Sequence, residues 1–189
     1  MSLFLISTIL YITFLLFLVI ALVMFFISNI KSSVAGAPFV PMNSKVVPRL
    51  LEFGGLSGDD NFYDLGCGDG RVLVSAANDF HVSMAIGYDL ALVPYLLSRW
   101  RVSWSGFSER VLVFRRNFME GDYKTATFVY LYLFPKVVDH LAGKLAKELR
   151  PGTRVLAPSF PIDLARHPEF TLLKSEKVGK ITAYLYEKK

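Results

Sequence analysis

The chain has 189 residues, of which 53% are hydrophobic and 20% are charged, and its formal net charge is +5. This length favours one domain of ordinary size, possessing its own core. Every charged residue follows position 30, since residues 1–30 contain no Asp, Glu, Lys or Arg. The distribution excludes a disordered, fibrous or multi-span membrane protein and indicates a hydrophobic segment joined to a globular domain.

Residues 1–30 are typical of a transmembrane anchor. At about 1.5 Å per residue, the uncharged run from Leu3 to Ile30 exceeds the roughly 30 Å hydrocarbon core of a bilayer. Lys31, Lys45 and Arg49 follow the run, and this predicts a single-pass protein with its globular domain on the cytoplasmic side. A cleaved signal peptide is the alternative, although the run is long for one and no basic side chain precedes it.

The next segment, residues 31–43, is predicted to be a linker. Its Pro38-Phe39-Val40-Pro41 block is stiff and extended, because each proline fixes its own φ and pushes its predecessor away from helix. The block acts either as a rigid spacer or as a lid over a binding site. The globular domain is expected over residues 44–189, beginning with a helix near Ser44.

From there, strands alternate with helices, which predicts an α/β domain built on a parallel sheet. Strands are expected over 61–65, 83–89, 110–114, 127–134 and 154–157, and helices over 71–78, 93–104 and 135–149. The last two strands, 172–178 and 181–186, are joined only by Gly179-Lys180. A hairpin of this kind adds an antiparallel edge to the sheet.

The turn after the first strand is the most informative stretch, reading Asp64-Leu65-Gly66-Cys67-Gly68-Asp69-Gly70. Glycines are needed where φ is positive or where a ligand approaches bare backbone. The G-x-G-x-G spacing, followed by Arg71, departs from the G-x-G-x-x-G pattern of nicotinamide sites. The acid at Asp64 suits a cationic or amine-bearing ligand rather than a pyrophosphate.

A second acid, Asp89, ends the second strand, where a carboxylate can accept both hydroxyls of a ribose. With the glycine turn and Asp64, it resembles the S-adenosylmethionine (SAM) signature of class I SAM-dependent methyltransferases. That resemblance implies a Rossmann-like seven-stranded sheet closing in an antiparallel hairpin, preceded here by one transmembrane helix.

The resemblance also assigns residues to parts of the cofactor. It places Asp64, Gly66, Gly68 and Gly70 along the methionine part, and Asp89 on the ribose. Asn117 and Phe118 match the adenine position, and Asp69 holds either the loop or the amino group. Cys67 is interpreted as a small filler between glycines. Tyr130 and Pro135 bracket the end of the fourth strand, beside the transferred methyl group.

Three further stretches narrow the resemblance: Pro38-Phe39-Val40-Pro41, Gly87-Tyr88-Asp89 and Ser159-Phe160-Pro161. The whole chain is similar to the membrane-anchored mitochondrial lysine methyltransferases that act on the adenine nucleotide translocase and the ATP synthase c-subunit. This implies a protein substrate within or beside a membrane, with Pro38 and Phe39 covering the site.

Other functions remain open at this stage. A lipid or quinone acceptor suits an anchored enzyme equally well, and a domain that binds SAM without catalysis is a further alternative. The sequence argues against a nucleic-acid partner, because it has no clustered basic stripe with interleaved aromatics. The single cysteine excludes an internal disulfide, and three widely spaced histidines predict no metal site. The sequence identifies no catalytic base.

Overall fold

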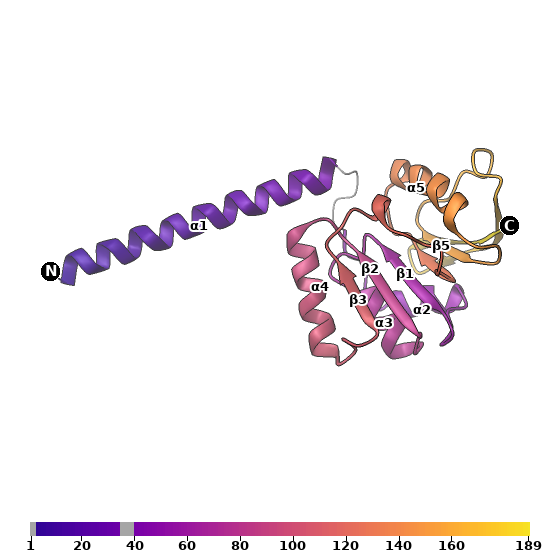
Figure 1. The fold of residues 1–189 in the computed structure, drawn as a ribbon, viewed down its shortest axis with the longest axis horizontal. Coiled ribbons are helices and arrows are strands. Elements are labelled where there is room, and N and C mark those ends of the chain that lie inside the picture. The colour runs from indigo at the N-terminus through magenta and orange to yellow at the C-terminus, as the bar shows by residue number, and fades with distance from the viewer. Residues whose placement is uncertain (1–2, 35–39) are drawn as a thin grey trace.

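The computed structural model describes residues 3–34 and 40–189 of the chain. Helix α1 (Leu3–Val34) projects from the globular domain (Figure 1). Its stretch Phe4–Val23 is long and apolar enough to cross a membrane and is 0% buried against the rest of the protein. Pro38 and Phe39, assigned above to a lid, lie outside the described residues.

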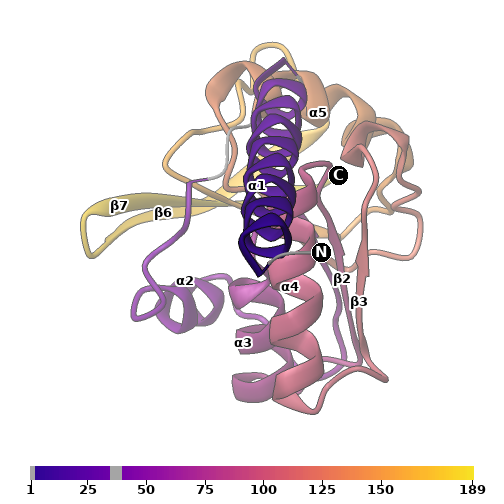
Figure 2. The same ribbon diagram turned by 90° about the vertical axis from the view of Figure 1, so that its left-hand side faces the viewer.

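The domain is built on one seven-stranded sheet with the order β3-β2-β1-β4-β5-β7-β6. Five strands are parallel: β1 (Asn61–Leu65), β2 (Met84–Tyr88), β3 (Val111–Phe114), β4 (Phe128–Tyr130) and β5 (Arg154–Pro158). Strand β7 (Ile181–Lys188) runs antiparallel to β5 and to β6 (Phe170–Val178). The predicted Rossmann-like sheet with its C-terminal hairpin is confirmed, and Figure 2 shows that hairpin extending past the helices.

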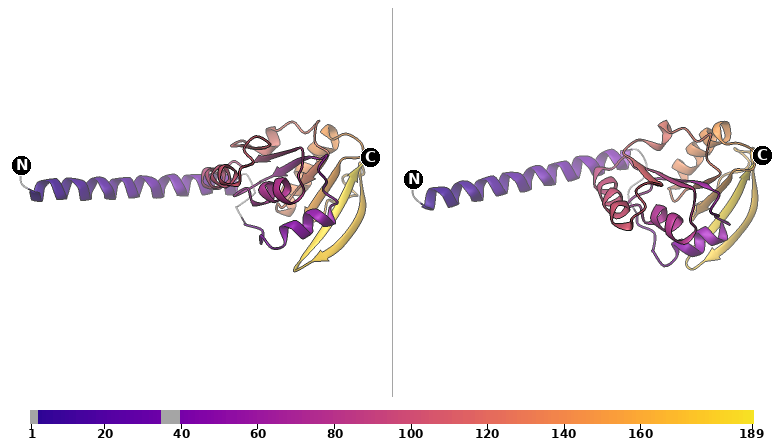
Figure 3. Two further views of the ribbon diagram at one scale, coloured as in Figure 1. Left: turned by 90° about the horizontal axis from the view of Figure 1, so that it is seen from below. Right: turned by 60° about the horizontal axis from the view of Figure 1, so that its bottom comes forward.

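Helices cover both faces of the sheet, as its parallel strands require. Helices α2 (Val47–Phe53) and α3 (Arg71–Asp79) pack on one face, where α4 (Leu92–Ser105) lies beside α3. Helix α5 (Pro135–Glu148) and the short 3-10 helix η1 (Phe118–Glu120) contribute to the core of the other face. Figure 3 shows these layers from two further directions.

Two predicted boundaries were wrong. The apolar run 127–134 forms a strand only over Phe128–Tyr130, because pairing with both neighbouring strands ends at Tyr130. The rest of the run connects the strand to α5, with Leu131 and Leu133 buried and Phe134 exposed, and apolar composition alone does not distinguish strand from connection. Helix α2 begins at Val47 rather than near Ser44, and no side chain caps it.

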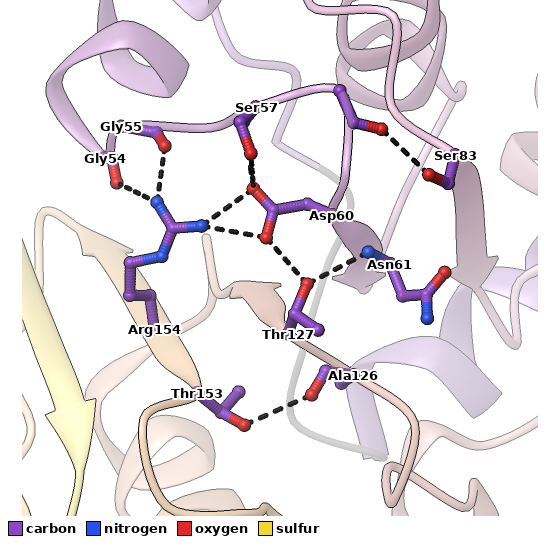
Figure 4. A network of polar contacts seen from close by, with 11 residues as sticks. Gly54, Gly55, Ser57, Asp60, Asn61, Ser83, Ala126, Thr127, Thr153 and Arg154 are labelled. Atoms are coloured by element: carbon purple, nitrogen blue, oxygen red, sulfur yellow. Dashed lines mark hydrogen bonds and ion pairs between the residues drawn. The ribbon is translucent and has the colours of Figure 1, made fainter.

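A partly buried ion pair ties the amino-terminal end of β1 to β5 (Figure 4). The Arg154 guanidinium donates to both Asp60 carboxylate oxygens, at 2.8 and 2.7 Å. The Thr127 hydroxyl and the Ser57 backbone N–H also donate to Asp60, at 2.6 and 2.9 Å. Burial raises the pKa of Asp60, but these hydrogen bonds and the Arg154 charge outweigh it and hold the pKa below its usual value.

Candidate active site

A cleft lies at the carboxyl edge of the sheet, where α/β folds bind their ligands. The β1–α3 turn, the ends of β2 and β4, and the segment entering the domain form its walls. Its lining residues are Val40, Pro41, Met42, Asp64, Gly66, Cys67, Gly68, Asp69, Arg71, Val72, Asp89, Leu90, Phe118, Tyr130, Tyr132 and Leu133.

The glycine turn forms one wall of the cleft. At two of its positions, Gly66 and Gly70, the structure leaves no room for a side chain. Gly66 has φ +88°, and a Cβ added there lies 2.7 Å from Leu133 Cδ2. Gly70 has φ +75°, and a Cβ there lies 2.9 Å from Ser98 Cβ of α4. A left-handed backbone with no free space favours glycine strongly. The turn therefore presents bare backbone to the cleft.

Asp69 fixes this turn to two helices. Its carboxylate accepts hydrogen bonds from Arg71 Nη2 at 2.7 Å and from Arg101 Nη2 of α4 at 2.7 Å. Arg101 Nε also donates to the Asp69 carbonyl at 2.9 Å. Burial raises the pKa of Asp69, but the two arginines outweigh it and lower that pKa. The contacts of Asp69 are thus those of a residue that holds the loop.

Asp64, by contrast, is buried without a cation. It is 2% exposed, and its Oδ2 has no hydrogen-bond partner among the described residues. Burial, and then the nearby carboxylates of Asp89 and Asp69, raises its pKa well above the usual value. Tyr130 of β4 lies opposite Asp64 of β1 in the sheet. Among the described residues, its hydroxyl is the other buried side-chain group without a hydrogen-bond partner. Both residues line the cleft.

Asp89 reaches the same cleft from the end of β2. Its Oδ2 accepts the Gly68 backbone N–H and its Oδ1 accepts the Ala91 backbone N–H, each at 2.9 Å. Burial raises its pKa to about 6 despite these hydrogen bonds. Each carboxylate oxygen has a lone pair left after these contacts, so the group retains acceptor capacity for a ligand.

Taken together, the charges around the cleft fit a ligand with a positive charge. Asp69 is neutralised by two arginines, whereas Asp64 and Asp89 have no ion-pair partner within residues 3–34 and 40–189. A buried carboxylate is costly unless it is paired. A ligand with an ammonium or sulfonium group would therefore supply the positive charge that these two carboxylates lack.

The described part of the predicted lid lies against this site. Val40, Pro41 and Met42 line the cleft, and Arg71 Nη1 donates a hydrogen bond to the Met42 carbonyl. Arg71 thus joins the entering segment to the same Asp69 that holds the glycine turn. No local sequence signal could have shown this contact, because it joins residues 29 positions apart.

Of the remaining predicted site residues, some line the cleft and others do not. Phe118 lines the cleft, whereas Asn117 is not among its lining residues and caps η1 by accepting the Met119 N–H at 3.0 Å. Cys67 is buried, and burial followed by the Asp64 charge raises its pKa, as expected of an unreactive filler. Pro135 begins α5 and is exposed outside the lining, while Gly70 packs behind the turn.

Aromatic residues lie beyond the end of β4. Phe134, which follows the lining residue Leu133, stacks on Phe160 with ring centroids 6.3 Å apart. Ser159, just before Phe160, has φ +75°, which is uncommon for a residue other than glycine. Sequence reasoning placed the stretch from Tyr130 to Pro135 beside the site without singling out Tyr132 or Leu133, and it did not assign Leu90. Side chains of this kind resemble core residues in the sequence.

Comparisons with known proteins agree with this geometry. Residues 64–168 match the model of the ANTKMT methyltransferase domain. A protein-lysine N-methyltransferase of Saccharolobus islandicus is 38% identical over 82% of this chain and 96% of its own length. The chain belongs to the ANTKMT methyltransferase family. It is therefore a class I methyltransferase that uses SAM, as the sequence predicted.

Two other similar proteins are named for different methyl acceptors. The adenine nucleotide translocase lysine N-methyltransferase of Mus musculus is 32% identical over 66% of this chain, which spans 54% of that protein. An RNA methyltransferase from Salinibacter ruber, solved with S-adenosyl-L-homocysteine, has 30% identity and a TM-score of 0.71. It aligns with 78% of this methyltransferase and 93% of its own chain.

The cleft of this methyltransferase fits the cofactor in two respects. SAM carries a sulfonium and an ammonium group, and the unpartnered carboxylate oxygen of Asp64 and the half-satisfied Asp89 face the cleft. SAM also requires close backbone approach, and the turn at Gly66 allows no side chain. The bound cofactor supplies an electrophilic methyl group on sulfur.

Proposed function

We propose that this enzyme methylates lysine side chains of a protein that lies within or beside a membrane. The similarity to the Saccharolobus islandicus protein-lysine N-methyltransferase carries the proposal, because it extends over 82% of this chain, the whole cleft included. The 53% hydrophobic composition, concentrated in an apolar α1, supports the membrane part of the proposal.

The site residues take the following roles in this proposal. Asp64 pairs with the positive charge of the methionine part, and the backbone at Gly66 and Gly68 lies along it. Asp89 accepts the ribose hydroxyls, and Phe118 packs against the adenine. Asn117 contributes indirectly by capping η1, which positions Phe118. Tyr130 directs its unpartnered hydroxyl toward the methyl-transfer position.

The reaction is a displacement in line with the breaking bond. The lysine Nζ lone pair forms the new N–C bond as the C–S bond breaks, and the electron pair of that bond remains on sulfur. The ammonium first loses a proton to solvent, and desolvation in a narrow apolar entrance favours the neutral amine. Phe134 and Phe160 provide such an entrance in the proposal, and the enzyme accelerates transfer mainly by alignment.

The same proposal places the protein in a membrane by a single pass of α1. Val40 to Met42 then cover the cofactor as a lid, and the domain over 44–189 faces the cytoplasm. Lys31, Lys45 and Arg49 support this orientation, because basic residues near a span favour the cytoplasmic side.

The test is the transfer of radiolabelled methyl groups from SAM to native membranes by the full chain. We expect labelled protein, with methyl-lysine after hydrolysis, and loss of the label with Asp89→Ala. Asp122→Ala is the control, because the Asp122 side chain is 70% exposed and is not among the residues that line the cleft. Label in the lipid extract, or in RNA as the Salinibacter ruber protein suggests, and none in protein would contradict the lysine proposal.

A further inference from the structure

Helix α4 has an unusual distribution of apolar residues. Its buried stripe consists of Pro94, Ser98 and Val102, at i, i+4 and i+8. Its outward stripe has the same spacing but consists of Leu96, Trp100 and Trp104, which are 53%, 60% and 78% exposed. A helix on a water-soluble surface normally shows the reverse arrangement, with its larger apolar residues buried.

The inward stripe is small because α4 lies directly against the glycine turn. A Cβ added to Gly70 would lie 2.9 Å from Ser98 Cβ, so Gly70 has no room for a side chain and α4 packs closely on the turn. This contact explains the buried face of α4 but not the exposed one. Leu97, 45% exposed, and Val93 widen the outward apolar surface, and the rings of Trp100 and Trp104 lie 5.7 Å apart.

The charge on this helix is of one sign. Residues 92–105 contain two arginines and no Asp or Glu, and of the two arginines Arg101 pairs with Asp69. Arg99 is exposed on the helix, and the Arg115 guanidinium lies near its start, 3.5 Å from the Leu90 carbonyl. The nearest acid after the helix, Glu109, follows its far end. Tryptophan and leucine combined with arginine are typical of helices that lie in the interface of an anionic membrane.

The position of α4 fits the same partner. Helix α1 leaves the domain from the side that α4 covers, and α4 runs across the direction of α1 in Figures 1 and 2. The two helices contact each other where α1 reaches the domain. A bilayer crossed by α1 would therefore lie against the outward stripe of α4.

We propose that the outward face of α4, comprising Val93, Leu96, Leu97, Trp100 and Trp104, inserts into the interface of an anionic lipid bilayer. The proposal extends the membrane part of the proposed function to a second contact. Because Arg101 of α4 binds Asp69 and Ser98 packs on Gly70, this contact would hold the cofactor cleft close to the membrane surface. A lysine at the surface of a membrane protein would then be within reach.

The chain offers a direct probe, because its only two tryptophans are Trp100 and Trp104. Tryptophan emission of the full chain thus reports on α4 and not on α1. The protein is reconstituted into phosphatidylcholine vesicles with and without phosphatidylglycerol, using brominated acyl chains as quenchers. We expect a shift to shorter wavelength and quenching, greater with phosphatidylglycerol. Bromine near the headgroup end should quench more than bromine near the tail.

Matched variants locate the contact on α4. Leu96→Gln with Leu97→Gln should reduce the quenching, whereas Leu172→Gln with Leu173→Gln should leave it unchanged. The second pair is also exposed, at 39% and 48%, but lies on β6 at the opposite edge of the sheet. Far-ultraviolet circular dichroism of each variant monitors folding.

Two results would overturn the proposal. Emission that is insensitive to brominated lipid excludes membrane contact, even when flotation shows that the chain is anchored through α1. A blue shift that depends on protein concentration and is independent of lipid indicates a second copy of the chain on this face instead. Flotation and SAM binding are measured separately, so failure of the anchor or of the proposed enzymatic function is distinguishable from failure of the α4 contact.

Discussion

Two buried aspartates at opposite ends of β1 have opposite surroundings. Asp60, just before the strand, is bound by Arg154, Thr127 and Ser57, and its pKa is lowered. Asp64, near the end of the strand, has an unpartnered oxygen, and its pKa is raised. Removing one partner of a buried ion pair destabilises the fold, because the other charge is left unpaired. A buried acid that lies in a cleft and lacks a partner is a candidate for binding a ligand.

The comparison of Asp60 with Asp64 predicts that a substitution at Asp60 has the largest effect on stability. Asp60→Ala leaves the Arg154 guanidinium without its partner and removes the link between β1 and β5. We expect the free energy of unfolding to fall by about 3 kcal/mol, at the low end for a buried pair because Arg154 is partly exposed. Chemical denaturation measures this loss. Asp59→Ala, at the exposed neighbouring residue, should change stability by less than about 0.5 kcal/mol.

The cleft acids predict an unusual pH dependence. The pKa of Asp89 is raised to about 6 in the folded protein, so folding favours its protonated form. Its contribution to stability is greatest at low pH and is lost as the pH rises through about 6. We expect unfolding of the ligand-free chain to require about 1 kcal/mol more at about pH 5 than at about pH 7.

Two measurements sharpen this pH prediction. Asp89→Asn should reduce the difference in unfolding free energy between the two pH values. The ligand-free chain is expected to be more stable at the lower pH, whereas the increase in melting temperature produced by SAM should be smaller there. The reason is that protonated Asp89 is a weaker acceptor for ribose hydroxyls. Equal stability of the wild-type chain at both pH values would contradict the assignment of Asp89 as a buried acid with a raised pKa.

Among the buried aspartates of the comparison, Asp64 is predicted to contribute least to stability. Asp64→Asn removes a group that makes no ion pair within the described residues, and the side chains have nearly the same shape. We expect the free energy of unfolding to remain within about 1 kcal/mol of the wild-type value. Thermal unfolding with no ligand present measures it. A loss as large as that of Asp60→Ala would show that Asp64 also serves the fold.

The sequence predicted the sheet well because its strands and helices alternate in hydrophobic pattern, and the final hairpin has a clear turn. It also placed Asp64, Asp89 and the glycine turn at the carboxyl edge of the sheet, where the cleft lies, since these residues are adjacent in sequence to strand ends. It assigned no role to Asp60, because the contacts of Asp60 depend on Arg154, which is distant in the chain. It likewise missed the Arg71 contact with Met42 and the Arg101 contact with Asp69, which tertiary packing creates.

The length of β4 shows the same limit. Leu131 and Leu133 are as apolar as the strand residues before them and equally buried, yet they follow the strand and Leu133 covers Gly66. Hydrophobicity predicts burial, whereas strand pairing depends on where the neighbouring strands end. The exposed tryptophans of α4 present the converse case, since helical periodicity predicts the helix but not which stripe faces the core.

The most direct test of this comparison is a calorimetric titration of SAM into three full-length proteins: wild type, Asp60→Asn and Asp64→Asn. The account predicts one site in the wild type and similar affinity in folded Asp60→Asn. In Asp64→Asn it predicts binding weaker by about tenfold, or about 1.4 kcal/mol. Wild-type affinity in Asp64→Asn would contradict the claim that this unpartnered carboxylate is kept for the cofactor.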